Sequence, residues 1–482
     1  MRVFQPECTL PEEGPAFIQQ PNVRSTMDII WSSLTIIFLC TWSITHLNVP
    51  PQVRPLPPAK SFWEECRRAF FEAWYSLRRK AVWMLVNILV PEFLLGKALA
   101  EFVAARHCTN AILEFQREEK HDDEISWTPT HSHYANMGGV FVKFESDHTE
   151  SSIIEASDTT SQWIKKLIDR CEAGYPGLGP FDWAVHKKHH EFARTWLNSH
   201  LNDSDGRFGA RMLSGDVWAL SASQLLLLRK MGVITRFPDI SERQINDKNK
   251  ADAVVKFIAI VQVLWLAIQL AVRAAAGRQS SQIEITALAF AVCALITYLL
   301  LIHRPKDVSV PVVISAYRDV TSEEFTEVIA LTQPVYLAGK SFYSIPTSTT
   351  PCTGTDSGRY SDLQTLGILG GLSVFGAVHL IAWNFQYPNE IERLIWRISA
   401  LMVTLLPIIA VLATDLVIPP DWQDESGIKG FVYKASTVIL VSVMVLFFVP
   451  RLYLLVEAFR STYFLPPTTY VTTWASNIPH IG

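Results

Sequence analysis

Apolar stretches of roughly membrane-spanning length alternate with polar segments along this chain. Seven such stretches occur, the first at Ile29–Leu47 and the last at about Val432–Val456. A helix needs about 20 mostly apolar residues to cross the hydrocarbon core of a bilayer. Because a backbone in lipid must satisfy its own hydrogen bonds, we expect these stretches to be helical. The pattern predicts a mainly α, polytopic helical membrane protein with six to seven transmembrane helices and a mixed, mostly helical extramembrane domain.

The alternation also divides the chain into segments. In order, they are a polar N-terminal segment (1–28), a first span (29–47), a basic amphipathic segment (48–80), a second apolar stretch (81–100), an extramembrane domain (101–250), a transmembrane hairpin of spans three and four (251–303), a polar loop (304–364), spans five to seven (365–456) and a C-terminal tail (457–482). The water-facing mass is therefore concentrated in one middle domain.

The segment from Asn48 to Lys80 sets the orientation in the membrane. It holds seven Lys or Arg against three acids, the strongest basic cluster beside any apolar stretch. Lys and Arg are enriched in cytosolic loops, so we expect this segment in the cytosol and the N-terminus on the opposite side. From Ser61 onward, apolar residues recur with helical spacing and place Trp63 and Trp74 on one face. That pattern predicts an amphipathic helix on the membrane surface.

The second apolar stretch, Ala81–Ala100, leaves two topologies open. Four residues interrupt it: Asn87, Pro91, Glu92 and Lys97. If the stretch crosses the bilayer, the chain has seven spans and the middle domain faces away from the cytosol. If it does not, the chain has six spans, a cytosolic middle domain and a C-terminus on the non-cytosolic side. We favour seven. The sequon at Asn202 is a glycosylation site only in the seven-span topology.

Composition and charge narrow the choice of partners. The chain is 49% hydrophobic and 18% charged, with a formal net charge of −4. A balance this near neutral gives no electrostatic reason to expect a nucleic acid. We expect the lipid bilayer as partner, with a small apolar compound as a candidate ligand, and no cofactor. The seven cysteines show no CxxC pair and no regular spacing, so they predict no zinc or disulfide framework.

Two groups of histidines are candidate metal ligands. His186, His189 and His190 form an H-x-x-H-H pattern, as in membrane desaturases and hydroxylases that hold iron with several such boxes. The other histidines do not reproduce those boxes, and the lysines between these three favour a solvated helix face. His131 and His133 would place two imidazoles on one side of a strand, but two ligands alone make a weak metal site.

Polar side chains within the apolar stretches are further candidates, because ionisable groups in lipid are costly and mark functional paths. His379 lies deep in its stretch and is the best single catalytic candidate, with Asp415 as its possible partner. Glu92, Asn384 and Asp415 lie near stretch ends, where an interfacial polar group is the simpler interpretation. Catalysis therefore has few candidate residues inside the membrane.

The known catalytic motifs do not decide the function. The sequence has no Walker loop, GxSxG elbow, HExxH helix, kinase set or dinucleotide fingerprint. We expect a non-enzymatic multi-pass membrane protein acting in transport, sensing or scaffolding. The alternative is a membrane-embedded enzyme acting on a lipid or other apolar metabolite, with His379 and Asp415 or the histidine-rich middle region at its site. The sequence does not distinguish plasma membrane from endomembrane.

Short motifs stand in a fixed order between residues 20 and 310. They are Asn22–Ser32, Phe38–Trp42, His46–Pro50, Trp127–Gly139, Ile245–Asp252, Thr286–Phe290 and Arg304–Val308. In this order they resemble a large group of fungal integral membrane proteins. The resemblance implies a multi-pass architecture and a fungal origin, and it carries over no catalytic residue.

Overall fold

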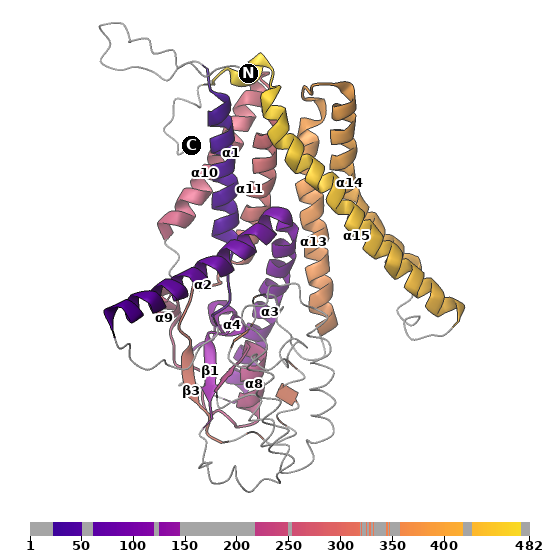
Figure 1. Cartoon of the computed structure of the whole chain (residues 1–482). Coiled ribbons are helices and arrows are strands. Elements are labelled where there is room, and N and C mark those ends of the chain that lie inside the picture. Colours follow the sequence, from indigo (N-terminus) through magenta and orange to yellow (C-terminus); the bar gives the residue numbers. More distant parts are fainter. Residues whose placement is uncertain are drawn as a thin grey trace, which may run out of the picture.

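The structure is a computed structural model of the 482-residue chain. It describes residues 23–50, 61–119, 125–144, 217–248, 253–318, 357–417 and 427–473, with single positions between 320 and 347. In these residues a bundle of long helices stands on a smaller domain of short helices and strands (Figure 1). The chain is mainly helical, as predicted.

The helices and strands follow one another in this order: α1 (Thr26–Ile44), α2 (Phe62–Leu89), α3 (Pro91–Glu118), α4 (Pro129–Asn136), β1 (Val140–Lys143), β2 (Val217–Ala219), α8 (Ala222–Lys230), α9 (Glu242–Asp247), α10 (Ala253–Ala275), α11 (Gln282–Leu300), β3 (Val312–Ser315), α13 (Ser357–His379), the 3-10 helix η5 (Leu380–Asn384), α14 (Glu390–Val417), α15 (Ile428–Arg460), the 3-10 helix η7 (Ser461–Tyr463) and α16 (Pro467–Tyr470).

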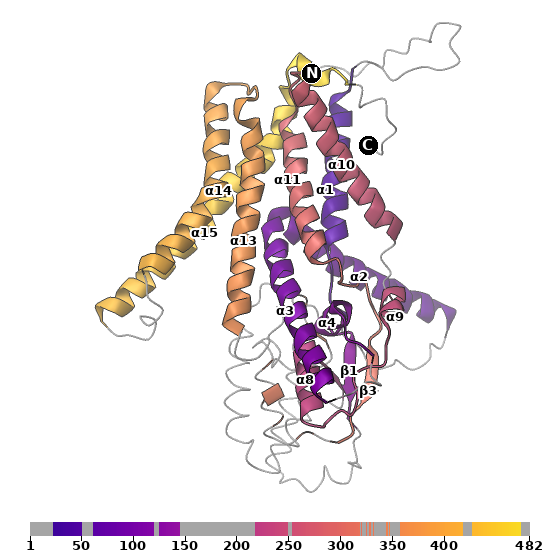
Figure 2. The same ribbon diagram turned by 180° about the vertical axis from the view of Figure 1, so that it is seen from behind.

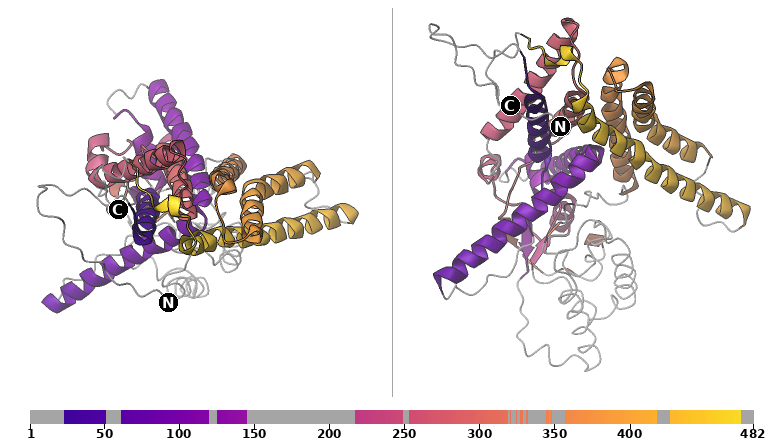
Figure 3. Two further views of the ribbon diagram at one scale, coloured as in Figure 1. Left: turned by 90° about the horizontal axis from the view of Figure 1, so that it is seen from above. Right: turned by 45° about the horizontal axis from the view of Figure 1, so that its top comes forward.

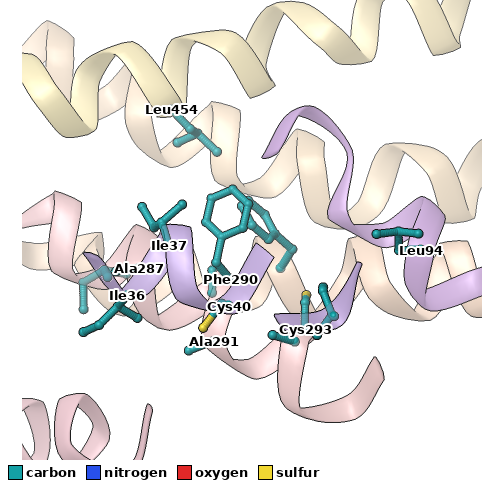
Figure 4. Packing of buried hydrophobic residues seen from close by; sticks show 14 of the residues in the cluster. Ile36, Ile37, Cys40, Leu94, Ala287, Phe290, Ala291, Cys293 and Leu454 are labelled. Carbon is teal, nitrogen blue, oxygen red and sulfur yellow. The ribbon is translucent and has the colours of Figure 1, made fainter. Parts of the chain in front are cut away.

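The bundle packs around a core that its helices share. Ile36 and Cys40 of α1 face Phe290 and Ala291 of α11, and Leu454 of α15 closes the same cluster (Figure 4). Small residues such as alanine and cysteine let helices approach closely, which is how helices associate inside a bilayer. Ser25 begins α1 with a capping box to Asp28, which agrees with the polar residues that precede the first apolar stretch.

Three helical segments among the described residues are long and apolar enough to cross a membrane by themselves. They are Thr26–Ile44, Gln282–Leu300 and Asp362–Asn384. A fourth is added if the bent pair α2 and α3 is counted as one span, and the apolar part of α10, Ile260–Ala275, is shorter. These helices agree with an integral membrane protein, but they do not support a count of seven spans.

The stretch Ala81–Ala100 is the clearest departure from prediction. Its helix ends at Leu89, and α3 begins at Pro91 after a bend of 106°. Proline has no backbone N–H and disfavours helical geometry in the residue before it, and Val90 accordingly has φ −143° and ψ 70°. The start of α2 and the end of α3 both lie on the side of the bundle that carries the small domain (Figures 1 and 2). The favoured crossing by this stretch is therefore not supported.

The small domain contains a three-stranded sheet in the order β2-β1-β3. β1 pairs antiparallel with β2 and parallel with β3. The turn before β1 requires glycine: Gly138 has φ +84°, and a Cβ on Gly139 would lie 2.5 Å from the Tyr134 ring. Trp218 of β2 and Leu225 of α8 are fully buried in the domain core, which Ile112 of α3 also joins. Helix α3 thus belongs to both the bundle and the domain.

The two ends of the described chain meet at the other end of the bundle. Val23 forms an antiparallel bridge with Val471, and the Arg24 N–H donates to the Tyr470 carbonyl at 2.9 Å. Seen along the bundle, α2 extends to one side and α14 with α15 to another (Figure 3). The bundle thus separates the joined chain ends from the small domain.

Candidate functional site: charges buried in the bundle

A buried ion pair joins the bend between α2 and α3 to the last long helix. Glu92 stands in the first turn of α3, where the helix dipole favours an acid. Its side chain is 0% exposed, and its Oε1 accepts from Arg451 Nη1 of α15 at 2.5 Å. The Arg451 guanidinium also lies 3.8 Å from the centroid of the Phe375 ring of α13. We call Glu92, Arg451 and Phe375 the bundle site.

The bundle site has unused hydrogen-bonding capacity. Within the part of the chain that the structure describes, Glu92 Oε2 and Arg451 Nη2 have no hydrogen-bond partner. The same holds for Asn87 Oδ1, three residues before the break in the helix. Leaving a buried polar atom unsatisfied costs about 1–3 kcal/mol, and more for a charged group. Such atoms are suited to bind water or a polar solute that enters the bundle.

Helix α3 reaches this position because glycines let it approach α13 closely. A Cβ on Gly367 would lie 2.6 Å from the Gly96 Cα, and one on Gly371 would lie 3.1 Å from the Glu92 Cβ. Real Cβ atoms do not approach that closely without a shift of the neighbours. Glycines of α13 therefore fix the depth at which Glu92 sits.

His379, the leading catalytic candidate, lies beside the bundle site and contacts neighbouring helices through its ring and its carbonyl. Its Nδ1 lies 2.8 Å from the Phe375 carbonyl, and its Nε2 lies 3.3 Å from Thr286 Oγ1 of α11. Trp396 of α14 donates to the His379 carbonyl at 3.3 Å. Because a carbonyl only accepts, Nδ1 donates to Phe375 and Nε2 carries the lone pair that faces Thr286, so the residue joins three helices.

The structure does not bring Asp415 to His379. Asp415 is in the last turns of α14, whereas Trp396, which packs on His379, is near its start. Asp415 follows Trp396 by 19 positions, which corresponds to roughly 28 Å of helix. The pair that the alternative enzyme hypothesis needs is therefore not assembled.

A second charged cluster lies where the bundle meets the small domain. Lys97 and Arg304 each donate to one oxygen of Glu101, and all three side chains are buried. Arg304 Nη2 also donates to Asn48 Oδ1 at 2.6 Å. These four residues, the junction cluster, tie α3 to the chain segments that follow α1 and α11.

His131 and His133 lie in helix α4, so the prediction of a strand for them is wrong. The Thr128 N–H donates to His131 Nδ1 at 3.1 Å, and His131 Nε2 therefore donates to the Ile240 carbonyl at 2.8 Å. Burial lowers the pKa of His131. Burial and the nearby Arg304 guanidinium lower the pKa of His133 to about 3. Both histidines are neutral parts of the domain core.

The candidate metal ligands receive no support from the described residues. No group of three His, Cys, Asp or Glu in them is arranged to hold a metal ion. His186, His189 and His190 lie outside the described residues, as does the sequon at Asn202.

Sequence reasoning gave too little weight to the charges that the structure pairs. It interpreted Glu92 as an interfacial polar group and predicted no partner for it, whereas the structure pairs its fully buried side chain with Arg451. Arg451 and Arg304 were not among the candidates at all. One signal was present: Arg451 is the only charged residue between Val438 and Val456 of the last apolar stretch, and a lone charge there requires a partner.

The described residues form a mainly helical protein whose three apolar helices of spanning length are compatible with an integral membrane protein. The chain belongs to DUF8562, a family of unknown function, which it matches over residues 3–168, 220–335 and 363–481. No curated protein and no solved structure matches it.

Proposed function

We propose that six helices cross the membrane: α1, α10, α11, α13, α14 and α15. The bend at Val90 supports this count, because it returns α3 to the side from which α2 starts. The bridge between Val23 and Val471 supports it too, because two chain ends on one side require an even number of crossings. This topology replaces the seven-span one.

The basic segment after α1 gives this topology an orientation. It lies on the side of the small domain, so the domain is cytosolic and both chain ends face away from the cytosol. Asn202 belongs to the cytosolic part in this arrangement and is not glycosylated. The resemblance to fungal membrane proteins remains the basis for inferring a fungal source.

The function that the geometry supports best is transport or sensing of a small polar solute through movement at the bundle site. The observation that carries it is the Glu92–Arg451 pair, which is buried in the bundle and has, among the described residues, no partner for one carboxylate oxygen and one guanidinium nitrogen. A solute that binds these atoms competes with the pair and favours a state in which α15 and α3 separate.

Helix α3 connects the bundle site to the small domain, which is cytosolic in the proposed topology. Its first turn holds Glu92, its middle holds Glu101 of the junction cluster, and its later residues, including Ile112, lie in the domain core. A shift of α3 at the bundle site therefore moves the small domain. Enzyme chemistry is less well supported, since His379 and Asp415 lie apart.

The test uses Cys293 of α11. Its side chain is fully buried and interacts electrostatically with both Glu92 and Arg451. A variant with Cys293 as its sole cysteine is reconstituted in liposomes and labelled with a membrane-permeant maleimide. If the pair is a lock, Glu92→Gln raises the labelling rate on the order of a hundredfold or more, since breaking a buried pair costs about 3–5 kcal/mol and each 1.4 kcal/mol is a factor of about ten.

A double variant distinguishes separation of the two helices from a general loss of stability. Glu92→Gln with Arg451→Gln leaves no unpaired charge, so we expect its thermal unfolding to stay near the parent while Cys293 still labels faster. Arg393→Gln, in the exposed pair with Glu390, is the control and leaves the rate unchanged. Equal protection of Cys293 in all variants would contradict a moving pair and favour a static scaffold.

A further inference from the structure

The first half of α2 presents an aromatic surface that no described residue covers. Trp63 is 80% exposed and Phe62 72%, and the rings of Phe70 and Trp74 are also largely exposed. The helix extends away from the bundle at its domain end (Figures 1 and 3). So large an apolar surface is not stable in water and marks a site that is covered in the working protein.

Most of the exposed aromatic side chains of α2 lie on one part of the helix circumference. At 100° per residue, Trp63, Phe70, Trp74 and Leu77 lie within about 60° of one another around the helix. Arg67 and Arg78 lie along one edge of this stripe, both exposed, and the exposed rings of Phe71 and Tyr75 lie beyond them. Arg68 stands on the opposite face, where it pairs with Glu64 at 2.5 Å. A broad aromatic face that carries arginines is the pattern of a helix lying in a membrane interface.

The second half of α2 is fixed to the end of α1. Lys80 Nζ lies 2.8 Å from Asp307 Oδ2 and 4.2 Å from the centroid of the Trp42 ring. Arg79 donates to the Asn48 carbonyl at 3.2 Å. Since Trp42 is near the cytosolic end of α1, these contacts hold α2 at the level where the hydrocarbon meets the headgroups.

We propose that α2 is an interfacial helix that binds anionic phospholipid of the cytosolic leaflet. The aromatic stripe enters the acyl boundary, and Arg67 and Arg78 bind headgroup phosphates or carboxylates. This proposal rests on the cytosolic placement of the small domain argued above. Its occupant is a lipid surface because both arginines are positively charged, exposed and aligned with the aromatic stripe, which matches an anionic leaflet in charge and in depth.

Insertion is tested with neighbouring spin labels on the full-length protein in nanodiscs. Leu77→Cys lies on the stripe and Ser76→Cys lies about 100° away toward the polar side. We expect the label at residue 77 to be more accessible to oxygen than to a water-soluble nickel chelate, and the label at residue 76 to show the reverse. Equal access of the chelate to both labels would overturn insertion. Shielding of residue 77 from both reagents would indicate a protein partner and would also overturn it.

Lipid preference is tested by the association of spin-labelled phosphatidylserine relative to phosphatidylcholine. A basic residue near an anionic surface contributes about 1 kcal/mol, so removing each arginine lowers the preference about fivefold. We expect the double variant Arg67→Gln with Arg78→Gln to lose the preference. The control, Arg236→Gln with Arg243→Gln, removes the same charge from exposed positions of the small domain and leaves the preference intact.

An unchanged preference in the Arg67 and Arg78 variant would contradict lipid binding by α2. This result is independent of Cys293 labelling, so α2 can bind lipid even if the Glu92–Arg451 pair proves static. Conversely, a failed lipid test leaves the bundle-site proposal standing.

Discussion

Among the described residues, the buried carboxylates Glu92, Glu101 and Glu284 each pair with an arginine from a distant part of the sequence. Glu92 is paired with a residue 359 positions away, and Glu101 with one 203 positions away. A buried pair is weak evidence for stability by itself, but breaking it is strongly destabilising because it leaves an uncompensated charge. Removing one partner of a buried pair should therefore destabilise the protein more than removing both.

The junction cluster makes this asymmetry testable. It holds two cations, Lys97 and Arg304, around one anion, Glu101. Glu101→Gln leaves both cations without a counter-charge, so we expect a loss of about 3–5 kcal/mol in the free energy of unfolding. Lys97→Met leaves the Arg304–Glu101 pair intact with no net charge, so we expect a much smaller loss in the free energy of unfolding. Thermal unfolding of both variants in detergent compares them, and an equal loss would contradict the charge argument.

His133 predicts how stability depends on pH. Its pKa is about 3 in the folded protein, lowered by burial and by Arg304, against an ordinary value near 6.5. Between these values the unfolded chain binds a proton that the folded chain does not, so stability falls as the pH falls below about 6.5. The expected slope is about 1.4 kcal/mol per pH unit.

The measurement compares unfolding of the parent and His133→Gln between pH 6.5 and 4.5. We expect the variant to lack this part of the slope. His107→Gln, which removes an exposed imidazole of α3, is the control and keeps the slope. A parent and a His133 variant with parallel curves would show that His133 is protonated in the folded protein.

These residues also show what sequence can and cannot predict about the site. The cost of an ionisable group in lipid marked Glu92 and His379 as unusual, because that cost depends only on local hydropathy. It could not pair Glu92 with Arg451, since the pairing depends on how α15 crosses α3. His379 was favoured for its depth, but its Nδ1 donates to the Phe375 carbonyl of its own helix, and its Nε2 faces Thr286 of α11, a contact that only the fold creates.

At the scale of elements, the contact between α3 and α13 depends on glycine. A Cβ on Gly96 would lie 2.4 Å from the Gln364 carbonyl oxygen and 2.9 Å from the Ile368 nitrogen, both backbone atoms of α13. Backbone cannot move aside as a flexible side chain does. The two helices must therefore separate if any side chain is added there.

Gly96→Ala is expected to destabilise the protein by about 1–3 kcal/mol, the usual cost of overpacking a tight interface. Gly370→Ala is the matched control on α13, because a Cβ there would meet nothing within 4 Å. Alanine is favoured over glycine in a helix by roughly 1 kcal/mol, so the control should be neutral or stabilising. Midpoints of thermal unfolding distinguish the two, and a tolerated Gly96→Ala would contradict the close approach.

The sequence predicted helices correctly where the signal was local, but it did not predict the direction in which the chain continues after α2. The amphipathic period of residues 61–80 and the apolar runs gave the correct helices, because periodicity reports burial along one segment. For Ala81–Ala100, composition left two topologies open, and we favoured the one in which it crosses the membrane. Pro91 was visible in the sequence, yet the 106° bend and the return of α3 to the domain side depend on packing against α13.

At the scale of the whole molecule, the chain ends form a latch on the side opposite the small domain. Arg24 pairs with Glu284 at the start of α11, with Nη1 and Oε1 2.5 Å apart, and its Nε donates to the Thr469 carbonyl at 2.8 Å. Arg273 of α10 donates to the Val471 carbonyl at 2.9 Å. Helices α1, α10 and α11 are thus tied to the C-terminal segment, which limits the movements open to the bundle.

The latch allows a direct test of the six-span topology. Antiparallel bridge partners have Cα atoms about 4.5–5.5 Å apart, within the range that a disulfide spans. We therefore expect Val23→Cys with Val471→Cys, in a variant without other cysteines, to form a cross-link in intact membranes. A protease site inserted between residues 145 and 216 then gives two fragments that stay joined until reduction. Val23→Cys with Val310→Cys, an exposed position on the domain side, should give separate fragments. Val23 lies at the start of α1, so a cross-link to Val471 places both chain ends on one side and is incompatible with an odd number of crossings. Absence of the cross-link would contradict both the latch and the six-span topology.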